Sequence, residues 1–153
     1  NPRLINNLLE IFQADSKVGM IGLAGSAKLR QDKPEWWISE LSTLFGTCYT
    51  RLSENEMVRN YYGEVPGGPG AYVHVAAIDG LFMATQYDLP WRADLFQGWH
   101  FYDISQSREF INAGYKVVIP HQQEPWVIHD CGHKPLDDSY YENMRIFKEN
   151  YNW

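Results

Sequence analysis

The sequence predicts an α/β protein, and three observations support this class. Apolar residues recur at helical spacing near the N-terminus, short runs elsewhere are rich in β-forming residues, and the two kinds of segment alternate. Such alternation is typical of α/β domains. The 153 residues amount to one domain and can bury a sizeable core. No internal repeat or linker divides the sequence, so we expect a single domain over residues 1–153.

The first half of the chain contains one predicted helix and two predicted strands. The helix covers residues 2–14, because apolar residues recur there at i, i+4 and i+8. Its apolar face is formed by Leu4, Ile5, Leu8, Leu9 and Phe12. Residues 18–23 form a short buried strand, and residues 44–52 are strand-like. The small residues 24–27 and the polar, glycine-rich segment 53–70 indicate loops.

The second half contains two predicted helices and four predicted strands. The strands cover residues 72–78, 81–85, 115–119 and 126–129. One helix runs from about 104 to 113 and ends at Gly114, a typical residue after a helix. The last helix covers about 137–150. We expect a bend at Asp79-Gly80 between the first two of these strands.

Composition and charge exclude several classes of protein. The net charge of −6 disfavours nucleic-acid binding, and no apolar run approaches the roughly 18 residues of a membrane span. Cys48 and Cys131 form no CxxC pair, so a reduced, cytoplasmic protein is the default expectation. The aromatic fraction of 15% fits a saccharide site and an aromatic core equally well. Arg108 and Lys116 fit solvated charges near the ends of elements.

Four blocks of sequence, taken together, resemble a known family. They are Ile78–Ala84, Trp99–Asp103, Ala113–Val117 and Ile128–Asp130. In this order they resemble the C-terminal half of a GT-A glycosyltransferase domain, closest to bacterial glycosyltransferase-like proteins related to family 2. The resemblance covers roughly residues 1–133. It implies part of a GT-A fold, in which helices flank a mostly parallel sheet and the nucleotide-sugar binds at the carboxyl ends of the strands.

The resemblance also implies an activity and its partners. We expect transfer of a sugar from a nucleotide-sugar donor, such as a UDP-sugar, to an acceptor hydroxyl, with inversion at the anomeric carbon. The acceptor is a glycan, a lipid-linked sugar or a small molecule, and a lipid-linked acceptor would bring the protein to the cytoplasmic face of a membrane.

The resemblance implies that Asp103 is the catalytic residue. In inverting GT-A enzymes an Asp or Glu at this place takes the proton of the attacking acceptor hydroxyl. The residues alone allow a second interpretation, because Asp103 and Gln106 have the spacing of a capping box at a helix start. The two roles are compatible, since the helix dipole favours an ionised carboxylate at this end.

His129 is the expected metal ligand. In metal-dependent GT-A enzymes a late histidine binds the divalent ion that bridges the phosphates of the donor, here Mn²⁺ or Mg²⁺. Imidazole suits Mn²⁺ better than Mg²⁺. A lone histidine at a strand end is also a common structural residue, and that interpretation remains open.

The expected substrate-binding residues flank Asp103 and the bend before it. Asp79 and Gly80 lie beside the donor sugar in the resembling proteins, although the same pair fits a simple turn. Trp99 and Tyr102 fit an acceptor platform or core packing. His100 fits a residue that orients the acceptor or the carboxylate, or a packed histidine.

One motif of the resembling family is absent from the sequence. No Asp-x-Asp follows an apolar strand, whereas GT-A enzymes use such a motif to bind the metal and the nucleotide. We therefore expect the chain to be the C-terminal portion of a transferase domain whose nucleotide-binding half precedes it. Such a portion would lack most of its nucleotide site and expose a sheet edge and apolar surface. We therefore expect it, on its own, to be inactive, poorly folded or a homodimer.

Two other functions fit the sequence. The aromatic residues fit a non-catalytic carbohydrate-binding or interaction domain. The segment His129-Asp130-Cys131-Gly132-His133, with His121 nearby, has residue types of a metal-dependent hydrolase, although its spacing matches no CxxC or HExxH motif. Tight, stoichiometric zinc would favour the hydrolase.

Overall fold

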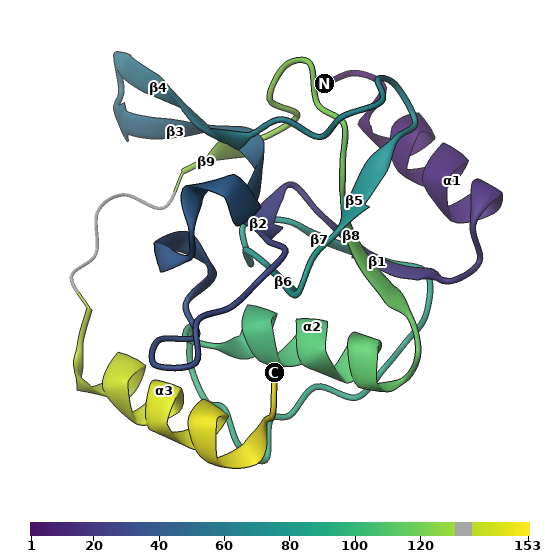
Figure 1. The fold of residues 1–153 in the computed structure, drawn as a ribbon. Helices are drawn as coiled ribbons and strands as arrows, with labels where there is room; N and C mark the ends of the chain where they lie inside the picture. Colours follow the sequence, from purple (N-terminus) through teal and green to yellow (C-terminus); the bar gives the residue numbers. More distant parts are fainter. Residues whose placement is uncertain (131–135) are drawn as a thin grey trace.

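The computed structural model describes residues 1–130 and 136–153. These residues form a mixed α/β structure with helices and two sheets, as the sequence predicts at the level of class (Figure 1). The helices are α1 (Leu4–Ala14), α2 (Tyr102–Asn112), α3 (Asp138–Asn150) and the short 3-10 turns η1 (Trp36–Ile38) and η2 (Leu41–Thr43). The strands are β1 (Val18–Gly22), β2 (Ala24–Ser26), β3 (Leu44–Ser53), β4 (Glu56–Gly63), β5 (Tyr72–His74), β6 (Ala77–Ile78), β7 (Met83–Thr85), β8 (Lys116–Pro120) and β9 (Ile128–His129).

The pairing within the two sheets is mixed. The first sheet has the strand order β5-β8-β1-β7, and only β1 and β8 run parallel. The second has the order β4-β3-β2-β6, with β9 added parallel to β3. Most of the described strand pairs are antiparallel, so the prediction of a mostly parallel sheet is wrong for the described residues. Hairpins and short bends join antiparallel neighbours, whereas only a long connection such as the one through α2 can produce a parallel pair.

The chain passes from one sheet to the other within a few residues at three places. Strand β1 leads into β2, β5 into β6, and β6 into β7, and each step changes sheet. The predicted strand 72–78 is therefore two strands, because its halves belong to different sheets. The third change of sheet takes place at the segment 79–82, which contains the expected bend at Asp79-Gly80. This bend therefore lies at a junction that both sheets hold in place.

Helices α1 and α2 cover opposite faces of the first sheet (Figure 1). Along β8 the side chains alternate, so that Val118 packs in the cluster with α1 and Ile119 in the cluster with α2. The predicted apolar face of α1 is partly wrong. Ile5 and Leu9 are exposed, whereas Ile11 is buried, because the contact with the sheet follows a narrower stripe than the sequence pattern.

Helix α3 packs against the beginning of α2. Phe147 of α3 is fully buried and contacts the ring of Phe101, with 5.7 Å between centroids. The same cluster contains Tyr140 of α3 and Trp36 of η1. Asp137 caps α3 by accepting a hydrogen bond from the backbone N–H of Tyr140. The cluster therefore joins three segments that are far apart in the sequence.

Two predicted loops are strands. Residues 24–26 form β2, the buried centre of the second sheet, although three small residues carry no strand pattern. Residues 56–63 form β4, which pairs with β3 in a long hairpin that projects from the body (Figure 1). No residue of β4 is fully buried, so it lacks the apolar alternation that would reveal a half-buried strand.

Candidate active site

Asp103 lies in the first turn of α2, where the backbone of Phe101 and the bend at Gly80 fix its position. Phe101 precedes the helix with φ of 67°, a left-handed conformation that few non-glycine residues adopt. Its ring is buried against α3, which offsets the strain. The N–H of Gly80 donates to Asp103 Oδ2 at 2.9 Å, and the N–H of Ile104 donates to Oδ1 at 2.8 Å. The carboxylate is thus oriented by backbone groups of two separate segments.

The capping-box interpretation of Asp103 is wrong. The N-cap is Phe101, and α2 begins at Tyr102, earlier than the predicted residue 104. Gln106 donates its side-chain N–H to the carbonyl of Leu89 at 3.1 Å and does not turn back to the helix start. The end of α2 agrees with the prediction, since Gly114 follows it with φ of 84°.

The carboxyl group of Asp79 acts on the titration of Asp103. Burial, and next the negative charge of Asp79, raise the pKa of Asp103 from 3.8 to about 7. Burial and then these two carboxylates raise the pKa of Tyr102 to about 12. The expected residues Asp79, Tyr102 and Asp103 therefore share one electrostatic environment, with a carboxyl group that titrates near neutral pH.

Gly80 permits the close approach of Tyr102. A Cβ atom at Gly80 would overlap the Tyr102 hydroxyl, so a larger residue would displace the Tyr102 side chain. Asp79 Oδ1 accepts a hydrogen bond from the N–H of Leu81 at 2.7 Å, which holds the bend. The predicted turn at Asp79-Gly80 is present, and it brings the turn residues directly beside α2.

His129 reaches the same environment from β9. It pairs with Thr50 of β3 in parallel register. Burial raises the pKa of Asp79, whereas the N–H of Leu81 and then the charge of His129 lower it. In the described ranges 1–130 and 136–153, no three His, Cys, Asp or Glu side chains converge in a way that could hold a metal ion. The described residues therefore do not by themselves complete a metal site around His129.

The residues of the alternative hydrolase cluster have different surroundings. Asp130 forms an ion pair with Arg51 at 3.3 Å. The Nδ1 of His121 lies 2.7 Å from the carbonyl oxygen of Val65. Cys131, Gly132 and His133 lie outside the described residues.

Trp99 and His100 have different surroundings. The Trp99 side chain is 83% exposed, so it is free to contact a ligand and does not fill the core. His100 packs edge-on against Tyr140, with 5.3 Å between centroids, and its Nε2 lies 3.7 Å from Asp137. Asn143 of α3 donates to the carbonyl of His100 at 3.1 Å. His100 thus joins the loop before α2 to the start of α3.

Three further residues border the site, and sequence reasoning missed them. Trp36 is buried, and its indole N–H faces Asp79. This N–H lowers the pKa of Asp79, but burial has the larger effect and raises it. Glu35 accepts a hydrogen bond from the hydroxyl of Tyr140 at 2.7 Å. Burial, and next Glu35, raise the pKa of Tyr140, and the charge of Asp103 contributes. An acidic residue directly before two tryptophans was the available signal.

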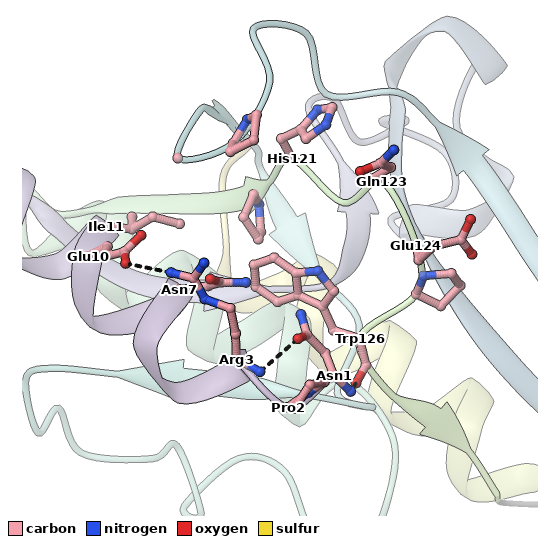
Figure 2. Close-up of a pocket in the computed structure, with 14 residues that line it drawn as sticks. Asn1, Pro2, Arg3, Asn7, Glu10, Ile11, His121, Gln123, Glu124 and Trp126 are labelled. Carbon is pink, nitrogen blue, oxygen red and sulfur yellow. Dashed lines mark hydrogen bonds and ion pairs between the residues drawn. The ribbon is translucent and has the colours of Figure 1, made fainter.

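A separate cavity of about 440 Å³ lies between the start of α1 and the segment after β8 (Figure 2). Trp126 occupies the middle of the view, with Arg3 and Asn7 of the first helical segment beside it. Arg3 forms an ion pair with Glu10 at 3.3 Å. Neither Asp79 nor Asp103 lines this cavity, so it is distinct from the candidate site.

The fold and the site define an α/β domain in which two carboxyl groups, those of Asp79 and Asp103, lie close enough for the charge of one to affect the other. A family model described as a glycosyltransferase-like family matches residues 1–151, and the chain belongs to this family. The resemblance seen in the sequence is thereby confirmed, and a glycosyltransferase is supported at the level of class. No curated protein and no solved structure matches the chain. Among the described residues, no helix is long and apolar enough to cross a membrane.

Proposed function

We propose that the protein transfers a sugar from a nucleotide-sugar donor to an acceptor hydroxyl by a single inverting displacement, with Asp103 as the general base. The carrying observation is the Asp103 carboxyl group, which two backbone N–H groups orient and whose pKa burial and Asp79 raise to about 7. A base with a pKa near the working pH is ionised often enough to act and basic enough to accept a proton.

The proposed reaction needs no covalent enzyme intermediate. The acceptor oxygen attacks the anomeric carbon while its proton moves to the Asp103 carboxylate. The new bond joins the acceptor oxygen to the anomeric carbon, and the bond from that carbon to the phosphate oxygen breaks. The electron pair leaves with the nucleoside diphosphate. Attack opposite to the leaving group inverts the configuration at the anomeric carbon.

Asp79 and Gly80 are proposed to lie beside the donor sugar, and Tyr102 beside the acceptor. Support comes from their positions: the Gly80 N–H and the Tyr102 ring both border the Asp103 carboxylate. The exposed ring of Trp91 lies 6.2 Å from that of Tyr102 and extends this aromatic border. Aromatic faces of this kind can stack on the apolar face of a sugar ring.

His129 is proposed to contribute one ligand to a divalent cation, Mn²⁺ or Mg²⁺. Such an ion would neutralise the diphosphate leaving group. The described residues do not complete its site, so no step above depends on it. Titration of the protein with MnCl₂ and UDP, repeated with His129→Ala, tests the proposal: tighter UDP binding with Mn²⁺ should be lost in the variant.

The activity is tested with purified full-length protein and a panel of nucleotide-sugars and glycan acceptors. We expect release of a nucleoside diphosphate and a product of inverted anomeric configuration. Asp103→Asn should lower kcat by about 10²–10⁴ while donor binding is retained, because the base is removed and the fold is not. Asp88→Asn, a change at an exposed aspartate in the loop after β7, is the matched control.

Wild-type turnover in Asp103→Asn would contradict the proposal. Absence of turnover in the wild type, together with sugar binding that Asp103→Asn leaves unchanged, would instead favour the carbohydrate-binding domain.

A further inference from the structure

The cavity between the start of α1 and the segment after β8 has the size and the lining of a small-ligand site (Figure 2). Its volume is about 440 Å³, and pockets for small ligands span roughly 300–1,000 Å³. Apolar side chains, among them Ile11, Pro120 and Trp126, line it together with polar ones such as Asn7 and His121. Sites of this composition bind an apolar surface and orient it with a few hydrogen bonds.

Trp126 provides a flat apolar wall of the cavity. The residue is half-buried and packs against the cluster that contains Leu8 and Ile11 of α1. Figure 2 shows its indole ring in the middle of the cavity, with Asn7 on one side and Glu124 on the other. Core contacts thus hold the ring in place, whereas its remaining surface lines the cavity, where an apolar ligand face would remove it from water.

Two polar side chains of the lining can exchange hydrogen bonds with a ligand. Asn7 is half-buried on α1, and its amide group both donates and accepts hydrogen bonds. The Nδ1 of His121 lies 2.7 Å from the carbonyl oxygen of Val65. Because a carbonyl only accepts, Nδ1 carries the proton, and Nε2 of the neutral ring is an acceptor. A ligand with several hydroxyl groups suits both residues, since a hydroxyl donates and accepts.

The charges of the lining favour a neutral ligand over an anionic one. Arg3 is the only lysine or arginine among the described residues that line the cavity, and it pairs with Glu10 at 3.3 Å. Glu124 also lines the cavity and pairs with Arg59 at 3.5 Å. Phosphates and carboxylates are bound mainly by such cations, so the described lining offers them no unpaired partner of this kind.

We propose that this cavity binds a neutral sugar ring. The ring lays its apolar face on the Trp126 indole and directs hydroxyl groups to Asn7 and His121. This arrangement uses the flat wall and the two hydrogen-bonding side chains of the lining, and it needs no cation.

The bound sugar is assigned to the glycan acceptor, as a unit other than the one that reacts. Neither Asp79 nor Asp103 lines the cavity, so the reacting hydroxyl lies elsewhere. Trp126 precedes His129 by three residues, so their Cα atoms are at most about 11 Å apart, a distance that a short oligosaccharide spans. This assignment to the acceptor rests on the proposed function, whereas sugar binding in the cavity does not.

The first test measures sugar binding to the purified full-length protein. Saturation-transfer NMR and titration use methyl hexosides and short neutral oligosaccharides as probes. We expect contact with the wild type, a rise in Kd of about three- to tenfold in Asn7→Ala from the loss of a hydrogen bond, and loss of contact in Trp126→Leu. Leucine keeps an apolar contact with the core but removes the flat ring, and circular dichroism shows whether each variant is folded.

Asn6→Ala is the matched control. Asn6 is the preceding residue of α1 and has the same side chain, but it is exposed and does not line the cavity. This variant should bind hexosides and turn over substrate as the wild type does. UDP and inorganic phosphate are the chemical controls, because neither should displace a hexoside whose contact depends on Asn7. Displacement by either would identify an anion site and overturn the proposal.

The assignment to the acceptor is tested with neutral acceptors of increasing length. In the wild type the acceptor KM should fall as sugar units are added, and in Trp126→Leu this dependence should disappear. Sugar binding that depends on Asn7 and Trp126 without any transfer would keep the cavity site and reject the proposed function. No hexoside contact with the wild type, or unchanged contact in both folded variants, would overturn the inference.

Discussion

Asp15 and Asp103 are the same residue type, yet their surroundings shift the pKa of the two carboxyl groups in opposite directions. Asp15, after α1, accepts hydrogen bonds from the Lys116 ammonium and the Tyr72 hydroxyl at 2.7 Å and from the Lys17 N–H at 2.8 Å. Those hydrogen bonds, led by the one from Lys116, lower the pKa of Asp15 to about 2. The carboxylate is fully paired, so it stabilises the junction between α1 and the sheet.

Asp103 lacks a cationic partner of this kind among the described residues. It is half-buried next to Asp79 and accepts hydrogen bonds from the backbone N–H groups of Gly80 and Ile104, and its pKa rises to about 7. A carboxyl group with a strongly shifted pKa is more frequent at functional sites than elsewhere in proteins. The difference indicates that surroundings, and not residue type, decide which carboxylate can take part in chemistry.

The pH dependence of activity should give the largest effect. Since the base must be ionised, kcat/KM should fall about tenfold per pH unit below the Asp103 pKa of about 7 and level off above it. Measurements of kcat/KM between pH 5 and pH 9 test this. A profile that is flat from pH 5 to pH 8 would exclude Asp103 as the base.

The stability of Asp103→Asn should give an intermediate effect. Because the folded-state pKa lies above the unfolded value, the folded state binds more protons between about pH 4 and pH 7, and stability falls as pH rises through that range. Asn removes this penalty, so the variant should gain about 1 kcal/mol or more relative to wild type at pH 8. At pH 4 the two proteins should be close in stability. Urea unfolding at both pH values measures the difference, and a variant less stable at pH 8 than at pH 4, relative to wild type, contradicts the assignment.

Asp15→Asn should give the smallest effect and the opposite sign. Its folded-state pKa lies below the unfolded value, so its contribution is present above about pH 4 and is lost as pH falls towards 2. The variant should therefore be slightly less stable than wild type at pH 7, and the two melting temperatures should converge near pH 2. Activity should not change. Thermal unfolding followed by circular dichroism measures this, and equal melting temperatures at pH 7 would show that the ion pair contributes nothing.

The sequence predicted a good part of the fold because the relevant signals are local. Residues 2–14, 104–113 and 137–150 carry helical spacing or end signals, and all three helices are present within a few residues of the expected bounds. Strand β4 was missed because it is solvent-exposed, and β2 because three small residues carry no pattern. Lys116, expected to be solvated, instead pairs with Asp15, a contact that spans 101 residues of sequence.

The sequence by itself determined the α/β class, the glycosyltransferase-like family and the bend that carries Asp79 and Gly80. These features can be predicted from the sequence because helical periodicity, glycine turns and family motifs each lie within a short segment of the chain. Only the tertiary structure decided that the Asp103 carboxyl has a raised pKa and that Glu35, Trp36 and Tyr140 border it. Burial and electrostatic coupling depend on which distant segments pack together, and no local pattern in the chain specifies those distances.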